Sequence, residues 1–217
     1  MTRSRWTGVA GLLFGLLFFS IDLFGPSTPD SSKADAVSQF ASYWSNADNQ
    51  TKSQIGTLLL TYACVLLIAF SAGLRDRLRA VDRGPLPSYV LAAGTAAAVL
   101  VGVGGAAAFA PGIAAADVSS LKVDGGLAVV LDDIGYVLLA TGLMAAGSMA
   151  VVTGLVSRRT GVLPQWTAWL GFLLGLTAVG SIFTAWLGFL GLPIWVVAIS
   201  IVLVVRAPDI APDVAAS

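Results

Sequence analysis

Three aspartates lie in or beside long apolar runs of this sequence, where a carboxylate is costly. Asp22 is near the end of the first run, and Asp132 and Asp133 are near the start of the fourth. An ionised side chain at the centre of a membrane helix costs about 2.5–3.5 kcal/mol on insertion scales, so such residues are candidates for function. The nearby hydroxyls of Ser20 and Thr57 would add oxygen ligands. The sequence therefore predicts a candidate ion or proton site at the three aspartates.

A second interpretation of these aspartates is structural. They would sit at the level of the lipid headgroups, cap or hydrate helix ends, and hydrogen-bond to Tyr136 or to loop amides. Asp132 shares a helical face with Gly135, Tyr136 and Leu139, which favours an inward orientation. Asp133 lies about 100° away on the same helix and points more sideways. Both interpretations remain open from the sequence alone.

Residue types that support enzyme chemistry are scarce. The chain has no His, and all twelve acidic residues are Asp. This excludes a His-based proton relay, general base or metal site. There is no phosphate-binding Gly loop, no Ser nucleophile elbow and no Cys pair, and Cys64 suits a small buried apolar position. We therefore expect no catalytic residue, metal or cofactor, and a protein that is not an enzyme.

Composition assigns the chain to the integral membrane proteins. Hydrophobic residues make up 57% of it and charged residues 11%, against about 45–50% and 25% in soluble domains. A helix needs about 20 mainly apolar residues to cross a bilayer. We expect an all-α polytopic transmembrane helical bundle forming a single membrane domain, 1–217. The predicted crossings are about 6–25, 54–74, 88–110, 127–156, 163–182 and 187–206.

The first crossing follows Arg3 and Arg5, as the apolar region of a signal peptide would. Its apolar run is longer than the 7–15 residues of such a region, so an uncleaved anchor is expected. The outer loop 26–53 comes next. Apolar residues at helical spacing predict one short extracytoplasmic amphipathic helix in it, over about 33–47, with Asp30 or Ser31 as N-cap. We expect this helix to pack on the bundle; binding a partner or ligand is the alternative.

The last apolar stretch, Leu163 to Val205, carries no charge. It is too long for one crossing and suits a tight helical hairpin. Pro164 is typical of a first helical turn, and Trp166 suits the membrane interface. We place the turn of this hairpin near 181–186.

Basic residues predict the orientation of the chain. Six crossings put both termini and the 75–87 and 157–163 loops on one side of the membrane. That side holds Arg3, Arg5, Arg75, Arg77, Arg79, Arg83, Arg158, Arg159 and Arg206. The other side holds Lys33, Lys52 and Lys122. Because cytoplasmic loops are enriched in Lys and Arg, we expect an inner-membrane protein with both termini cytoplasmic.

Two further patterns concern packing and the membrane surface. The Gly-x-x-x-Gly pairs Gly11/Gly15 and Gly171/Gly175 allow close helix approach, either inside the bundle or at a dimer interface. The cluster formed by Arg75, Arg77, Arg79 and Arg83 is a topology determinant or a site for anionic lipid headgroups. Membrane lipids are therefore expected partners, with a protein partner or a second copy as further candidates. The net charge of +0 argues against nucleic acid.

Two stretches carry a resemblance to a known family. They are RRTGVLPQWTAWLG at 158–171 and GLRDRLR at 73–79. Over about residues 54–206 the chain resembles the uncharacterised six-helix membrane proteins of GC-rich, actinobacterial-type bacteria, grouped as a domain of unknown function. The resemblance implies a helical bundle in a bacterial cytoplasmic membrane. It implies no catalytic residue.

The sequence thus favours a non-enzymatic membrane scaffold or an accessory subunit for a partner. The alternative is a small transporter or ion-coupled carrier that uses the outer aspartates. A polar cavity at mid-depth would favour the carrier, whereas a dry interior packed with Ala and Gly would favour the scaffold.

Overall fold

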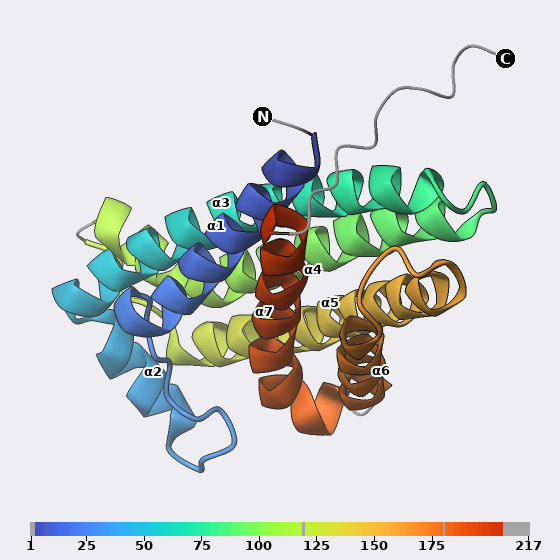
Figure 1. The fold of residues 1–217 in the computed structure, drawn as a ribbon. Helices are drawn as coiled ribbons and strands as arrows, with labels where there is room; N and C mark the ends of the chain where they lie inside the picture. The colour runs from blue at the N-terminus through green and yellow to red at the C-terminus, as the bar shows by residue number, and fades with distance from the viewer. Residues whose placement is uncertain (1–2, 119, 180, 206–217) are drawn as a thin grey trace, which may run out of the picture.

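The computed structural model describes residues 3–118, 120–179 and 181–205, which form seven helices and no strand. Figure 1 shows their arrangement. The helices are α1 (Arg3–Phe24), α2 (Ala36–Trp44), α3 (Ala47–Arg79), α4 (Leu86–Asp117), α5 (Gly125–Thr160), α6 (Gln165–Val179) and α7 (Ser181–Val205).

Five of these helices are long and apolar enough to cross a membrane: α1, α3, α4, α5 and the 187–205 part of α7. The expectation of an all-helical chain with several helices of membrane-spanning length is confirmed. With 15 residues, α6 is shorter than the roughly 20 that a full crossing needs.

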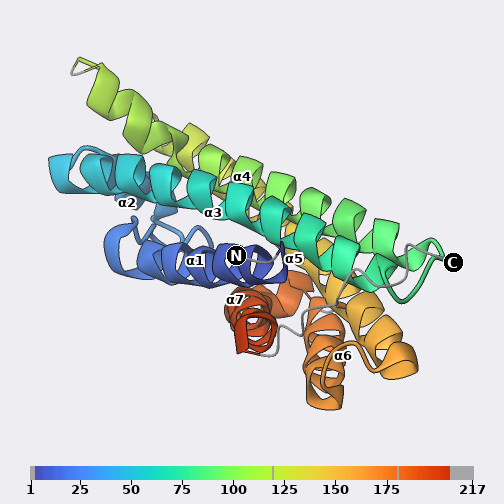
Figure 2. The same cartoon turned by 45° about the horizontal axis from the view of Figure 1, so that its top comes forward.

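Helices α3, α4 and α5 form the long axis of the molecule (Figures 1 and 2). With 33 residues, α3 is about 50 Å long, which exceeds the hydrocarbon thickness of about 30 Å. Helix α4 packs against both α3 and α5, α1 packs against α3 and α7, and α6 packs against α5. In Figure 1, α7 crosses the direction of α3 steeply.

The two ends of the long axis differ. The α3–α4 and α5–α6 loops lie together at one end, which we call the arginine end because it carries Arg75, Arg77, Arg79, Arg83, Arg158 and Arg159. Helix α2 and the connection from α4 to α5 lie at the opposite end, which we call the α2 end (Figure 1). Loops that are far apart in the sequence are thereby grouped by charge.

Capping groups extend the helices beyond their apolar runs. The Asn46 side chain accepts a hydrogen bond from the Asp48 amide, at 2.9 Å, at the start of α3. The Asp124 carboxylate accepts from the amides of Gly126 and Leu127 at the start of α5. These bonds satisfy amides that a helix N-terminus leaves without partners. Helix α3 therefore begins at Ala47 and α5 at Gly125, ahead of the predicted crossing starts at 54 and 127.

Three sequence predictions about element ends are wrong. Helix α4 does not end at 110 but continues through Pro111 to Asp117. The hairpin turn was predicted near residues 181–186, but these residues are helical. Helix α6 ends at Val179 and α7 begins at Ser181. The short outer helix starts at Ala36 rather than after Asp30 or Ser31.

The late start of α2 has a local cause. The Asp30 carboxylate accepts hydrogen bonds from the Ser32 amide at 3.0 Å and from the Ser32 hydroxyl at 2.7 Å. An aspartate that bonds two residues ahead closes a turn instead of capping a helix. Phe40 and Trp44 of α2 are fully buried and pack with Ala128 of α5, so α2 lies against the bundle.

Glycines set the closest contacts between helices. A Cβ on Gly104 of α4 would lie 2.7 Å from the Gly135 carbonyl oxygen of α5, and a Cβ on Gly135 would lie 2.7 Å from the Gly104 carbonyl oxygen. The two backbones are therefore in direct contact at this point. Only a residue without a side chain fits on either helix here.

Both Gly-x-x-x-Gly pairs face helices of the same chain. Gly11 and Gly15 lie against α7, where Ser200 and Val197 approach them. The other pair lies against α5: a Cβ on Gly171 would be 2.5 Å from the Ala150 carbonyl oxygen, and one on Gly175 would be 3.5 Å from that of Gly147. Within the described chain these motifs join α1 to α7 and α6 to α5.

Candidate functional site

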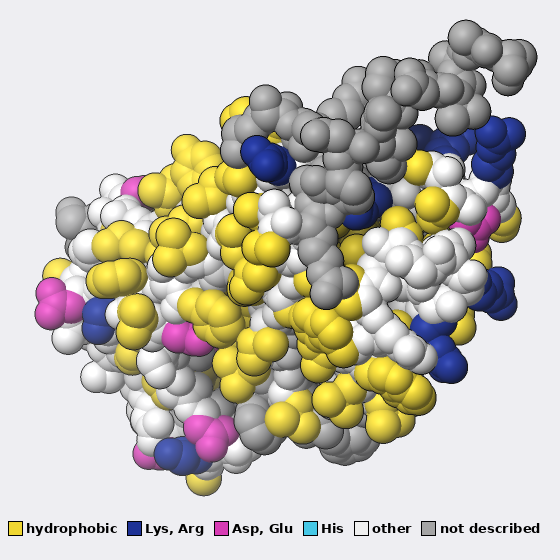
Figure 3. Space-filling model, in the orientation of Figure 1, with side chains coloured by type: hydrophobic (Ala, Val, Ile, Leu, Met, Phe, Trp, Pro, Cys, Tyr) yellow, Lys and Arg dark blue, Asp and Glu magenta, His cyan; other side chains and the backbone are white. Residues whose placement is uncertain are grey.

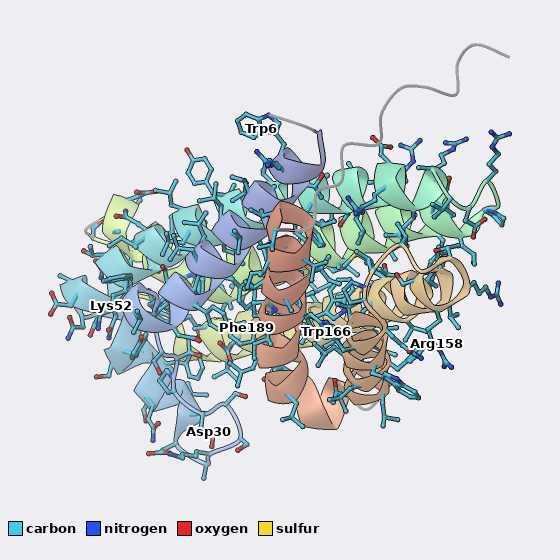
Figure 4. All side chains as sticks on the ribbon, in the orientation of Figure 1. Trp6, Asp30, Lys52, Arg158, Trp166 and Phe189 are labelled. Carbon is cyan, nitrogen blue, oxygen red and sulfur yellow. The ribbon has the colours of Figure 1, made fainter. Side chains whose placement is uncertain are left out.

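A cavity of about 380 Å³ lies toward the α2 end, between α1, α3, α4, α5, α7 and the loop that follows α1. We call it the α1–α5 cavity. Its lining residues are Ile21, Asp22, Gly25, Pro26, Ser27, Thr28, Leu60, Val101, Gly104, Gly105, Ala108, Phe109, Asp132, Gly135, Tyr136, Leu139 and Phe189. Figure 4 shows Phe189 where α1 and α7 meet, and Asp30 in the outer loop below. Six chain segments thus build one site.

The pattern along α5 places one face of that helix in the cavity. Asp132, Gly135, Tyr136 and Leu139 are spaced three and four residues apart, which puts them on the same side of a helix. All four line the cavity, as their shared face indicated. Gly135 lets α4 approach α5 to backbone contact beside this face.

The structure brings two of the three predicted aspartates together. Asp22, at the C-terminal end of α1, and Asp132, near the start of α5, line the same cavity. Asp133 lies on another face and borders a shallow apolar depression beside Val130 and Ile134. The separation of Asp132 from Asp133 follows from the 100° between successive helical residues.

The loop after α1 covers the cavity, and hydroxyl groups hold it there. We call residues 25–31 the strap. The Thr28 hydroxyl hydrogen-bonds to the Asp132 carboxylate, and the Ser31 hydroxyl donates to Asp133 Oδ1 at 2.8 Å. The Tyr43 hydroxyl is hydrogen-bonded to the backbone of Ser27. Both aspartates of α5 therefore accept a hydrogen bond from a side-chain hydroxyl of the strap.

Burial and hydrogen bonds shift the pKa values of two groups at the α2 end. Burial raises the pKa of the Tyr43 phenol, and the hydrogen bond to the Ser27 backbone opposes that rise. Hydrogen bonds from the Ser32 hydroxyl and amide lower the pKa of Asp30. Among the described residues, no hydrogen bond or ion pair reaches the Asp22 carboxylate. Among the residues that the structure describes, no Lys or Arg lines the cavity, so Asp22 and Asp132 are its charged side chains.

Sequence reasoning missed other parts of the site. Phe109 and Phe189 line the cavity from α4 and α7, and nothing in their local sequence separates them from the other aromatic residues that such helices carry. The proposed oxygen donors Ser20 and Thr57 do not line it. Ser20 instead donates to the Leu16 carbonyl of its own helix at 2.8 Å.

The α1–α5 cavity combines a few polar groups with apolar walls. Within the described ranges, no three acidic or Cys side chains gather as metal ligands would. Oxygen donors from two carboxylates, a phenol and the strap are combined here with apolar and aromatic walls. Such a lining matches the mainly apolar character of small-molecule sites with few polar groups.

The arginine end is a second polar region. Arg75 lies 3.9 Å from Asp76, and the Arg158 guanidinium lies 5.2 Å from the centre of the Trp169 ring. Figure 3 shows most of the visible Lys and Arg gathered at this end and most of the Asp at the other. Trp166 is on the same α6 turn as Trp169 (Figure 4). The Arg158 contact places a cation beside a tryptophan, as is common at a membrane interface.

Comparison of the chain with protein families, with curated proteins and with solved structures gives no match.

Proposed function

We propose that this chain is a non-enzymatic integral membrane protein that acts as a scaffold or an accessory subunit for a partner. Close packing of large side chains, away from the α1–α5 cavity, carries this proposal. Phe14, Phe70, Met149 and Trp195 come from four different helices and are at most 2% exposed. Dense packing between Gly-rich helices suits a rigid support.

The proposed topology has six crossings, with α6 and α7 as a paired hairpin and both termini in the cytoplasm of a bacterial cell. Two contacts support a return to the arginine end. The start of α6 lies beside the end of α5, where a Cβ on Gly154 would be 3.1 Å from the Ala168 carbonyl oxygen. The end of α7 meets the start of α1, where Val204 approaches Gly8. The concentration of Arg at this end supports its cytoplasmic location.

Single-cysteine labelling tests this topology. Cys64 is the only cysteine, so a Cys64→Ala background can carry one new cysteine at a time. In right-side-out vesicles, a membrane-impermeant maleimide should label Ser32→Cys at the α2 end and leave Gly84→Cys in the α3–α4 loop unlabelled until the vesicles are opened. Labelling of both sites from outside would overturn the proposal, as would the reverse pattern.

The accessory role is tested by cross-linking in the native membrane. Lys33, Lys52 and Lys122 all belong to the α2 end, so an impermeant amine-reactive reagent added from outside joins partners there. Mass spectrometry should identify one recurrent partner or a second copy of the chain. A variant with all three Lys changed to Arg should no longer give the cross-linked product. Recovery of the chain alone would contradict a scaffold role.

A carrier is the second candidate, because the α1–α5 cavity combines Asp22 and Asp132. If the protein is a carrier, adding an organic cation to proteoliposomes should drive proton movement, which a pH-sensitive dye inside them reports. The Asp22→Asn variant should lose this movement. The scaffold predicts no such movement. The two candidates therefore give opposite results in one assay.

A further inference from the structure

We propose that the α1–α5 cavity is a binding site for an organic cation with an apolar body, reached from the α2 end. The proposal concerns binding and depends on neither the scaffold nor the carrier. It rests on three features of one site: the charge of its lining, the character of its walls and the position of the strap.

The charge of the lining selects a cation. Asp22 and Asp132 face one cavity, and its described lining contains no Lys or Arg. Asp22 has no hydrogen-bond or ion-pair partner among the described residues. Asp22 is exposed and Asp132 is half-buried, and a carboxylate beside apolar surface attracts a nearby positive charge more strongly than a fully hydrated carboxylate does. A ligand cation would supply that charge.

The walls of the cavity select an organic ligand over a hydrated inorganic ion. Phe109, Phe189 and Tyr136 contribute aromatic rings, and Leu60 and Val101 contribute aliphatic surface. Aromatic faces attract ammonium-type cations, with the largest effect where water is excluded. The volume of about 380 Å³ lies within the roughly 300–1,000 Å³ of small-molecule pockets. A hydrated metal ion would leave this apolar surface unused.

The strap is the part of the site that a ligand displaces. Thr28 hydrogen-bonds to Asp132 and lines the cavity, so its hydroxyl occupies the position that a cation would take beside this carboxylate. Ser31 is bonded to Asp133, outside the cavity lining, which keeps the far end of the strap attached. Asp132 and Asp133 therefore have different roles: Asp132 binds the ligand, and Asp133 anchors the strap.

Calorimetric titration of the full chain in nanodiscs tests the proposal. The probe is phenyltrimethylammonium, and its neutral isostere tert-butylbenzene reports the contribution of charge. Asp22→Asn and Asp132→Asn remove one cavity carboxylate each. Asp133→Asn is the matched control, because it makes the same chemical change outside the cavity and its remaining carbonyl still accepts from Ser31. Circular dichroism and a monodisperse elution profile establish that each variant is folded.

We expect the wild type to bind the cation at least about tenfold more tightly than the neutral isostere, and each cavity variant to lose about tenfold in affinity while Asp133→Asn retains the wild-type value. Equal binding of the two probes by the wild type would overturn the proposal, even if a variant failed to fold. Equal loss in all three variants would also overturn it, as would heats no greater than those of empty nanodiscs. None of these outcomes bears on the cross-linking test, so the two proposals fail separately.

Discussion

The contact between Gly104 and Gly135 makes a sharp stability prediction, because it also closes one wall of the α1–α5 cavity. In Gly104→Ala the new Cβ would lie 2.7 Å from the Gly135 carbonyl oxygen and 3.1 Å from the Leu139 amide nitrogen. Both are backbone atoms of α5 and cannot rotate away. The helices must separate, and the cavity must change shape.

The magnitude follows from two opposing effects. Ala is favoured over Gly in a helix interior by about 0.8–1.0 kcal/mol, which stabilises the variant. Overpacking of a close contact costs about 1–3 kcal/mol. The matched control is Gly102→Ala, two residues away on α4, where the Cβ would lie 3.3 Å from the Cys64 sulfur, a side-chain atom. Since both variants share the helix-propensity gain, Gly104→Ala should be less stable than Gly102→Ala by about 1–3 kcal/mol.

Thermal unfolding of the purified protein in one detergent measures this difference. For a domain of about 200 residues, 1 kcal/mol corresponds to roughly 2–4 °C in Tm, so Gly104→Ala should unfold about 2–12 °C below Gly102→Ala. Gly135→Ala makes the reciprocal contact with the Gly104 carbonyl and should behave like Gly104→Ala. If all three variants shared one Tm, the α4 and α5 backbones would not be in contact, and this description of the cavity wall would be wrong.

Three further predictions concern the α2 end and its caps. Asp124→Ala should destabilise the protein by about 1 kcal/mol, seen as a lower Tm, because the first amides of α5 lose their acceptor; an unchanged Tm would show that water replaces the cap. Ser31→Ala should speed hydrogen exchange in the strap, because Asp133 loses its donor, while exchange at the centre of α5 stays as it was. Equal exchange rates of the strap in the variant and the wild type would refute the role of Ser31 as an anchor. The pKa of Asp30 should lie below 3.8 by NMR titration and rise in a Ser32→Ala variant. Because folding lowers the pKa of Asp30, the turn that Asp30 closes is fully stabilised above the unfolded-state pKa and loosens as the pH falls through the folded-state pKa. A Ser32 amide signal that does not change with pH would contradict this.

The candidate site was predictable in part, for an identifiable reason. Asp132 and Gly135 are three residues apart in a long apolar run, and helical periodicity alone places them on one face. That Asp133 points elsewhere follows from the same geometry. The pairing of Asp132 with Asp22 was a weaker expectation, because it needed both the depth of each residue and the order of the helices. Phe109 and Phe189 had no local signal at all.

Element ends were predicted less well, because hydropathy marks the membrane core and not the helix. The caps at Asn46 and Asp124 extend α3 and α5 into polar sequence. Pro111 and Pro193 lie inside α4 and α7, although each removes one backbone donor. In a tightly packed bundle, neighbouring helices stabilise a segment that its own propensity would end.

By itself, the sequence determined that this protein is helical and apolar enough for a membrane, that most of its Arg residues gather in a few short segments, and that His chemistry is excluded. These properties depend on composition and on the spacing of residues along one helix. The tertiary structure decided that Asp22 and Asp132 share a cavity, that Asp133 anchors the strap, and that glycines of different helices meet. Those facts depend on distances between segments up to about a hundred residues apart, which no local periodicity encodes.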